Sequence, residues 1–156
     1  ALNNLEKGAR VHDIGKIGIR DNVLNKHGPL TKHEFGEMQR HTTIGAKILE
    51  PVKSLQSIVP IVRSHHERVD GTGYPDGLNG QNIPIEARIV AVADCFDAMT
   101  TDRPNRKAFP VAKAIEEIKH TSGTHFDKEI VDAFLIAYSG KQIWTDNTKT
   151  KNKKSA

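Results

Sequence analysis

The chain has 156 residues and a mass of 17.3 kDa, which is enough for one domain with a core and short for two. Apolar residues make up 37% and charged residues 27% of the chain, which is typical of soluble globular proteins and excludes the disordered class. No run approaches the ~18 apolar residues of a membrane span. The single cysteine, Cys95, excludes a disulfide within the chain. We therefore expect a cytoplasmic protein.

The net charge of +4 comes entirely from the C-terminal tail, because residues 141–156 hold five lysines and one aspartate. Residues 1–140 carry equal numbers of basic and acidic side chains, which argues against a DNA- or RNA-binding face. We expect one domain over residues 1–140 and a basic, disordered tail over 141–156. Residues 1–11 have the pattern of a helix end, so we expect a longer protein that supplies one or more preceding helices.

The apolar pattern is helical along almost the whole chain. Thr31 and Glu34 have the spacing of a capping box. The helix that follows is predicted to place these residues on one face: Met38, His41, Gly45, Ile48 and Val52. In the next helix, over residues 55–66, Pro60 marks a kink or a start.

The second half of the chain predicts three more helices. Residues 86–101 are apolar on nearly every side, which indicates a buried central helix. Amphipathic segments follow at residues 111–119 and 130–138. Between the earlier helices and these lies the segment 69–80, which contains four glycines and a proline and predicts a long turn-rich loop. We expect an all-α fold, because no alternating pattern is strong enough to build a sheet.

Six residues of metal-ligand type fall at helix ends or on inward helix positions: His12, Asp13, His41, His65, His66 and Asp94. A single inward histidine is more commonly a core residue, but a carboxylate among apolar residues needs a charge or several donors. Neighbouring helical residues point ~100° apart, so each adjacent pair suits two ions, with a carboxylate such as Asp13 between them. Two ions ~3.5–4 Å apart are the usual arrangement for phosphoester hydrolysis. Imidazole with carboxylate suits iron, manganese or zinc.

Three motifs follow in order: HDIGK at residues 12–16, HHE at 65–67 and DGTGYP at 70–75. In this order and spacing they resemble the HD-GYP family of bacterial cyclic di-GMP phosphodiesterases, over roughly residues 9–136. The resemblance implies an HD-domain helical bundle with a centre of two or three iron or manganese ions. The implied metal ligands are His12, Asp13, His41, His65, His66 and Asp94.

The resemblance also implies roles for residues around the metals. The implied catalytic residues are Asp13 and Lys16, and the implied substrate-binding residues are Lys16, Arg103, Arg106, Gly73, Tyr74 and Pro75. Lys16 follows His12 by four residues, so in a continuous helix the two side chains would lie on the same side. From there Lys16 would contact the scissile phosphate. Asp97, one turn after Asp94, is expected to support a ligand rather than bind metal. The alternatives are a surface lysine at 16, surface arginines at 103 and 106, and a loop that only connects two helices.

Some positions depart from the family pattern or lie outside the motifs. Val69 and Asn105 stand where the family commonly has aromatic residues, so we expect weaker affinity for a guanine base. The wider HD superfamily uses a further histidine from an earlier helix, and residues 1–11 contain none. The histidines outside the motifs are predicted to lie on the surface: His27, His33, His120 and His125.

The leading functional hypothesis is a signal-transduction enzyme that hydrolyses cyclic di-GMP to pGpG, or onward to GMP. The alternative is a catalytically weak module that binds cyclic di-GMP or a diguanylate cyclase through the loop at residues 71–80. A generic HD nucleotide phosphohydrolase is disfavoured by the HHE and GYP motifs. Family members usually carry receiver or sensor domains, so we expect such a domain upstream, and a homodimer is a further expectation.

Overall fold

The computed structural model describes residues 2–102 and 107–139. Over these residues the chain forms helices and loops, with only isolated β-bridges at Asp70–Asn79 and Ser122–Phe126. The predicted all-α fold is confirmed. None of the helices in the described part of the chain is long and apolar enough to cross a membrane.

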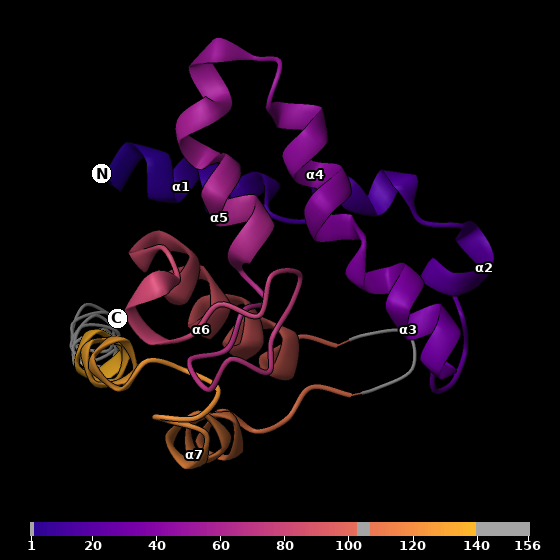
Figure 1. Ribbon diagram of the computed structural model, residues 1–156. Coiled ribbons are helices and arrows are strands. Elements are labelled where there is room, and N and C mark those ends of the chain that lie inside the picture. The colour runs from indigo at the N-terminus through magenta and orange to yellow at the C-terminus, as the bar shows by residue number, and fades with distance from the viewer. Residues whose placement is uncertain (1, 103–106, 140–156) are drawn as a thin grey trace, which may run out of the picture.

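The N-terminal half consists of short helices that pack around one another (Figure 1). They are α1 (Leu2–Val11), the 3-10 helix η1 (Ile14–Gly18), α2 (Asp21–Leu24), α3 (Lys32–Gln39), α4 (His41–Leu49), the 3-10 helix η2 (Lys53–Ile58) and α5 (Val59–Ser64). Helix α4 packs against both η1 and α5, and α1 packs against α5. Helix α5 begins at Val59 and Pro60 lies in its first turn, so of the predicted kink or start at this proline the structure shows a start.

The capping box at the start of α3 is confirmed, because the Glu34 N–H donates to Thr31 Oγ1 at 3.3 Å and the Thr31 N–H donates to Glu34 Oε2 at 2.7 Å. The prediction that one helical face continues from Met38 to Val52 is wrong. A turn at Arg40 separates α3 from α4, and the side chains of Ile48 and Val52 are 42% and 44% exposed. The physical reason is that α4 ends at Leu49, just before Pro51, so Val52 no longer follows the helical period.

Helix α4 meets η1 at an unusually close backbone contact formed by two glycines. A Cβ atom on Gly15 would lie 1.9 Å from the His41 carbonyl oxygen and 2.4 Å from the Gly45 nitrogen. Only a residue without a side chain fits at this position. The glycine of the HDIGK motif therefore sets how closely Asp13 approaches α4.

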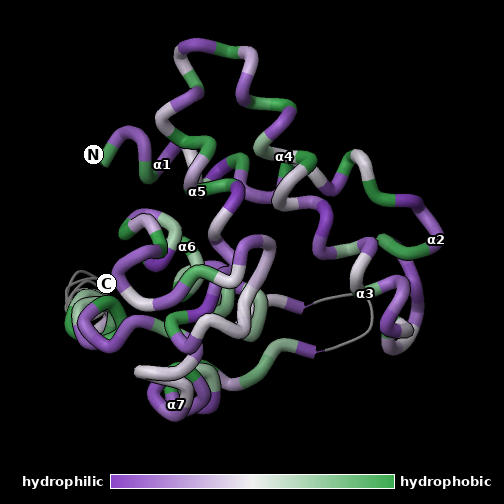
Figure 2. Tube along the Cα trace, viewed as in Figure 1, coloured by the Kyte–Doolittle hydropathy of each residue, from purple (hydrophilic) through white to green (hydrophobic). Residues whose placement is uncertain are grey.

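The C-terminal half is built on the long helix α6 (Ile85–Thr100), which follows the short 3-10 helix η3 (Gly80–Asn82). Helix α7 (Val111–His120) and a helical segment at residues 128–139 pack on one side of it. Figure 2 shows green, hydrophobic stretches and purple, hydrophilic ones within the same helices, as expected for helices that bury one face.

Helix α6 joins two apolar clusters. On the side of α4 and α5, the buried residues are Leu49, Ile58, Ile61, Val62 and Val90. On the side of α7, they are Val92, Met99, Ala114, Ile118, Phe126 and Val131. The prediction of a buried central helix over residues 86–101 is confirmed in part, because Ala87, Val90 and Val92 are buried whereas Ala93 and Asp97 are exposed. Packing from α5 and α7 covers two sides of the helix and leaves a third uncovered.

A buried ion pair ties α6 to the last helical segment. Arg88 Nη1 donates to Asp127 Oδ2 at 2.5 Å, and each side chain is only 9% exposed. Asp127 also caps the segment 128–139, because its Oδ1 accepts from the backbone N–H groups of Glu129 and Ile130. Burial raises the pKa of Asp127, but the hydrogen bonds from Arg88 and the two N–H groups outweigh burial and lower it overall.

Candidate metal centre

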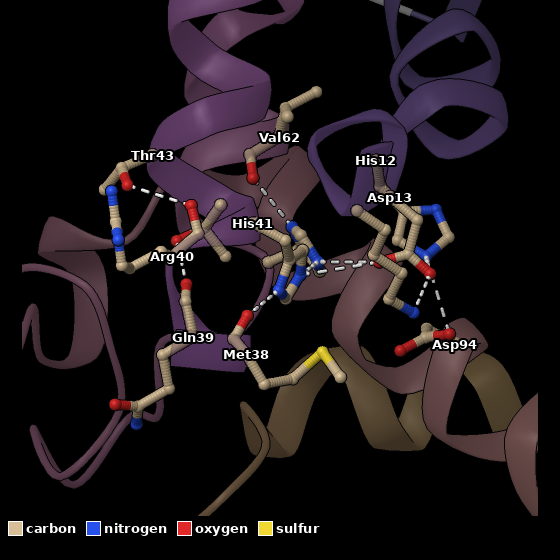
Figure 3. A network of polar contacts seen from close by, with 12 residues as sticks. His12, Asp13, Met38, Gln39, Arg40, His41, Thr43, Val62 and Asp94 are labelled. Carbon is tan, nitrogen blue, oxygen red and sulfur yellow. Dashed lines mark hydrogen bonds and ion pairs between the residues drawn. The ribbon is translucent and has the colours of Figure 1, made fainter. Parts of the chain in front are cut away.

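Residues far apart in the chain converge where the ends of three helices meet α6. His12 and Asp13 directly follow α1, His41 begins α4, and His65 and His66 follow α5. One ligand atom from each of four residues lies within 4.8 Å of the others: Asp13, His41, His65 and His66. His12 and Asp94 lie beside this group (Figure 3).

Three of the imidazole rings are oriented in the same way. Each places Nδ1 near the carbonyl oxygen three residues earlier: His12 at 2.7 Å from Ala9, His41 at 2.7 Å from Met38, and His65 at 2.8 Å from Val62. In a neutral ring, Nδ1–H then donates to the carbonyl and Nε2 keeps its lone pair. Metal-binding histidines are commonly held by such a bond from their second nitrogen. Each of these Nε2 atoms also lies within 4.0 Å of an Asp13 carboxylate oxygen.

Asp13 lies between the imidazoles of His41 and His65 on one side and the His12 imidazole with the Lys16 ammonium on the other. Its Oδ1 is 3.4 Å from His41 Nε2 and 4.0 Å from His65 Nε2. Its Oδ2 is 3.4 Å from His12 Nε2 and 2.6 Å from Lys16 Nζ. Figure 3 shows His41 on one side of Asp13, and His12 and Asp94 on the other. The two carboxylate oxygens thus face different sets of nitrogen atoms, which is the geometry a bridging carboxylate requires.

Two atoms of this cluster are buried and form no hydrogen bond in the described structure: His12 Nε2 and Asp13 Oδ1. The contact of His12 Nε2 with Asp94 Oδ1, at 3.5 Å, is an ion-pair contact beyond the normal hydrogen-bond length. A buried polar atom without a partner costs about 1–3 kcal/mol. A divalent cation would satisfy both atoms, and imidazole with carboxylate is a donor set for transition metals.

The electrostatics favour the protonation states that metal ligands need at Asp13, His65, His66 and Asp94, whereas at His12 they favour the protonated ring. Burial lowers the pKa of His65 to about 4 and that of His66 to about 3. The Asp94 carboxylate raises the pKa of His12 despite its burial, and His12 in turn lowers the pKa of Asp94 to about 2. Burial raises the pKa of Asp13, but the hydrogen bond and charge of Lys16 outweigh it and lower the pKa overall. His65 and His66 are therefore neutral and both carboxylates ionised at neutral pH.

The glycine-rich loop is attached directly to this cluster. Its Tyr74 ring packs on His66, with 4.9 Å between ring centroids, and the Tyr74 N–H donates to the His66 carbonyl at 3.2 Å. Glu67 is 3% exposed, and its carboxylate accepts from the N–H groups of Asp76 at 2.7 Å and Leu78 at 3.0 Å. Glu67 thus holds the loop against the residues that precede it. Glu67 is the third residue of the HHE motif, and no role was predicted for it.

The fold and the cluster agree with what comparison with known proteins finds. The HD domain family matches residues 1–130. The chain belongs to the HD domain family. This match confirms the HD domain that the three motifs predicted.

Two curated relatives illustrate the similarity. A cyclic di-GMP phosphodiesterase of Thermotoga maritima is 48% identical over 136 residues, which cover 86% of this chain and 37% of the relative. The cyclic di-GMP phosphodiesterase response regulator RpfG of Xanthomonas campestris is 47% identical over 133 residues, which cover 84% of this chain and 35% of the relative. The chain thus spans about a third of the length of these relatives.

Solved structures share the fold of this HD domain. Bd1817, an HDG"Y"P protein from Bdellovibrio bacteriovorus, superposes with a TM-score of 0.64 at 22% identity, over 83% of this chain and 41% of that one. V-cGAP3, a cyclic GMP-AMP specific phosphodiesterase of Vibrio cholerae, superposes with a TM-score of 0.67 at 19% identity, over 92% of this chain and 40% of that one. At these identities the similarity supports the fold alone.

The remaining predicted site residues of the HD domain have different outcomes. Lys16 does not continue the helix of His12, because α1 ends at Val11 and Lys16 lies in η1, where it contacts Asp13. Asp97 is exposed and its carboxylate accepts from Thr101 at 3.4 Å. Arg103 and Arg106 lie outside the described residues, as does Asn105.

The prediction that His125 lies on the surface is wrong. The residue is half-buried, and its ring stacks on Phe126 with 4.1 Å between centroids. Burial lowers its pKa. Long-range packing of the turn after α7 against the loop causes this burial, because Val69 N–H donates to the His125 carbonyl. Nothing in the local sequence around residue 125 indicates that contact.

Proposed function

We propose that this HD domain is the catalytic part of a metal-dependent phosphodiesterase that hydrolyses cyclic di-GMP to pGpG, and onward to GMP. The observation that carries the proposal is the position of Asp13, whose Oδ1 faces the Nε2 atoms of His41 and His65 and whose Oδ2 faces that of His12. The proposal is supported by three relatives that are 48%, 47% and 44% identical and named cyclic di-GMP phosphodiesterases.

In this proposal the centre holds two or three iron or manganese ions. Asp13 would be shared, with His41, His65 and His66 on one side of it and His12 and Asp94 on the other. Bound ions of this kind supply an activated water and offset the negative charge that develops on a phosphodiester. The ionised carboxylates and the two neutral imidazoles His65 and His66 are already in the protonation states that binding requires.

The residues around the ions have separate roles in the proposal. Lys16 lies beside Asp13 and offers an ammonium group to a phosphate held at the centre, so it would stabilise the additional charge of the transition state. Gly73, Tyr74 and Pro75 would form the rim of the site. Arg103 and Arg106 would position the dinucleotide, and Asp97 would act from outside the ligand set.

The relatives also guide the choice of substrate and of partners. Relatives named cyclic di-GMP phosphodiesterases are 41–48% identical to this chain, whereas those named 3′3′-cGAMP-specific phosphodiesterases are 36–38% identical. This difference favours cyclic di-GMP. We also propose a regulatory domain elsewhere in the full protein, because the relatives are longer and one is a response regulator. A diguanylate cyclase remains a proposed partner at the loop.

The test is hydrolysis of cyclic di-GMP by protein purified without oxygen and loaded with Fe²⁺ or Mn²⁺. We expect metal-dependent appearance of pGpG or GMP on an ion-exchange column, and loss of the reaction in Asp13→Asn. Binding of cyclic di-GMP by metal-loaded protein without any turnover would overturn the enzyme and support the weakly catalytic binding module.

A further inference from the structure

A cleft of about 330 Å³ opens beside the metal centre. Its walls include Phe35 and Gln39 from α3, Arg68 and Tyr74 from the loop, and His125 from the turn after α7. His66 belongs both to the cleft and to the candidate ligand cluster. Ligand pockets commonly measure about 300–1,000 Å³, so the cleft is large enough for one nucleoside of a dinucleotide.

Aromatic rings form one corner of the cleft. Phe35 and Tyr74 meet at 81°, with 6.3 Å between ring centroids, and the Phe35 side chain is 47% exposed. The Tyr74 ring also packs against the His66 ring and, edge to face, against the His41 ring, with 4.9 and 6.5 Å between centroids. An exposed aromatic side chain at the edge of a cleft can stack on a nucleobase, because every base has a π face. Stacking holds the base without distinguishing guanine from adenine.

Arg68 supplies the group that can distinguish them. Its Nε and Nη2 donate to Asp70, at 2.8 Å for the shortest contact, and Asp70 is itself held by the N–H and hydroxyl of Thr72 at 3.0 and 2.6 Å. The guanidinium orientation is therefore set by neighbours on the same loop. A guanidinium has five N–H donors, more than the carboxylate of Asp70 takes up. Donors at the edge of a base match the O6 and N7 acceptors of guanine, whereas adenine presents an N–H₂ donor in place of O6.

We propose that this cleft binds one guanine of the cyclic dinucleotide, with Phe35 and Tyr74 as its stacking wall and Arg68 as the residue that selects guanine over adenine. The inference rests on the proposed function, because it assumes a cyclic dinucleotide at the neighbouring metal centre. The phosphate at the centre and the base in the cleft would then be adjacent parts of one nucleotide, on the two sides of His66.

The experiment compares cyclic di-GMP with cyclic di-AMP, in which both bases are changed. Affinities of metal-loaded protein are measured by equilibrium dialysis with radiolabelled dinucleotides, and kcat/KM is measured where turnover occurs. The variants are Arg68→Gln and Phe35→Ala. The matched controls are Arg63→Gln, which breaks a loop ion pair with Asp76 outside the cleft, and Ile48→Ala, which removes an exposed apolar side chain from α4.

We expect Arg68→Gln to reduce the preference for cyclic di-GMP about 5- to 100-fold, the range for loss of a bidentate contact to guanine. Phe35→Ala should weaken both dinucleotides by similar factors, because stacking does not depend on the base. Both controls should keep the wild-type preference. An unchanged preference in Arg68→Gln, or an equal loss in Arg63→Gln, would overturn the inference.

The outcomes separate this inference from the proposed function. If the wild-type protein binds cyclic di-GMP selectively and Arg68→Gln loses that selectivity, but no hydrolysis occurs, the guanine site is supported and the proposed enzymatic activity is rejected. If the wild-type protein hydrolyses cyclic di-GMP and Arg68→Gln keeps the same preference, the enzymatic activity is supported and the guanine site is rejected. If the wild-type protein binds neither dinucleotide, the cleft is rejected. Hydrolysis of bis(p-nitrophenyl) phosphate, which has no base, then reports separately on the metal centre.

Discussion

The contact between η1 and α4 offers a quantitative test of how the centre is held. In Gly15→Ala the new Cβ atom would lie 1.9 Å from the His41 carbonyl oxygen and 2.4 Å from the Gly45 nitrogen. Both neighbours are backbone atoms of α4, so no side-chain rotation relieves the overlap. Restoring a separation of 3.0 Å requires η1 to move away from α4 by roughly 1 Å, which is a severe form of overpacking.

Overpacking costs about 1–3 kcal/mol and occasionally more, and two backbone neighbours place this change at the upper end, about 3 kcal/mol. The same movement would carry Asp13 away from His41, which begins α4. Loss of a residue that hydrogen-bonds a metal ligand typically lowers metal affinity about 10–100-fold. We expect the affinity of Gly15→Ala for Mn²⁺ to fall by at least this factor, because a ligand itself is displaced. The free energy of unfolding is measured from urea titrations followed by circular dichroism, and the affinity by calorimetry.

The matched control is Gly36→Ala in α3, where an added Cβ atom would meet nothing within 4 Å. This variant should be more stable than wild type by about 0.5–1 kcal/mol, because alanine loses less conformational entropy in a helix than glycine. It should bind Mn²⁺ as the wild-type protein does. Wild-type stability and wild-type affinity in Gly15→Ala would refute the close approach of η1 to α4 and the dependence of the metal centre on it.

Three further predictions concern single side chains. Asp13→Asn should lose bound Mn²⁺ and turnover while keeping its helical spectrum, as measured by elemental analysis and circular dichroism, and full metal content would contradict a shared carboxylate. Lys16→Met should keep its metal and lose about 10²–10³ in kcat, whereas a change in KM alone would assign Lys16 to ground-state binding. Asp127→Asn should cost about 3 kcal/mol at pH 7, because it leaves Arg88 buried without its partner. Since the pKa of Asp127 is lowered in the folded state, its contribution is present above the unfolded-state pKa of about 3.9. The difference from wild type should shrink in urea titrations below pH 4, and exposed Asp132→Asn should show no such loss at pH 7.

The elements of the fold were largely predictable because their signals are local. The capping box of α3, the start of α5 beside Pro60 and the loop over residues 69–80 each depend on a few neighbouring residues. The prediction for α6 failed in one respect, because composition says how apolar a helix is and not how many helices pack against it. Ala93 and Asp97 are exposed since no described element covers that side.

For the candidate metal centre, the residue types and the order of the motifs could be recognised from the sequence alone. The close approach at Gly15 and the placement of one Asp13 oxygen toward His41 and the other toward His12 became visible only in the folded chain. Only the tertiary structure brought α3, the loop and the turn after α7 together around Arg68. The physical reason is that helical period and turn chemistry act over a few residues, whereas these contacts join segments that are distant in sequence and meet only when the apolar faces of α4, α5 and α6 pack.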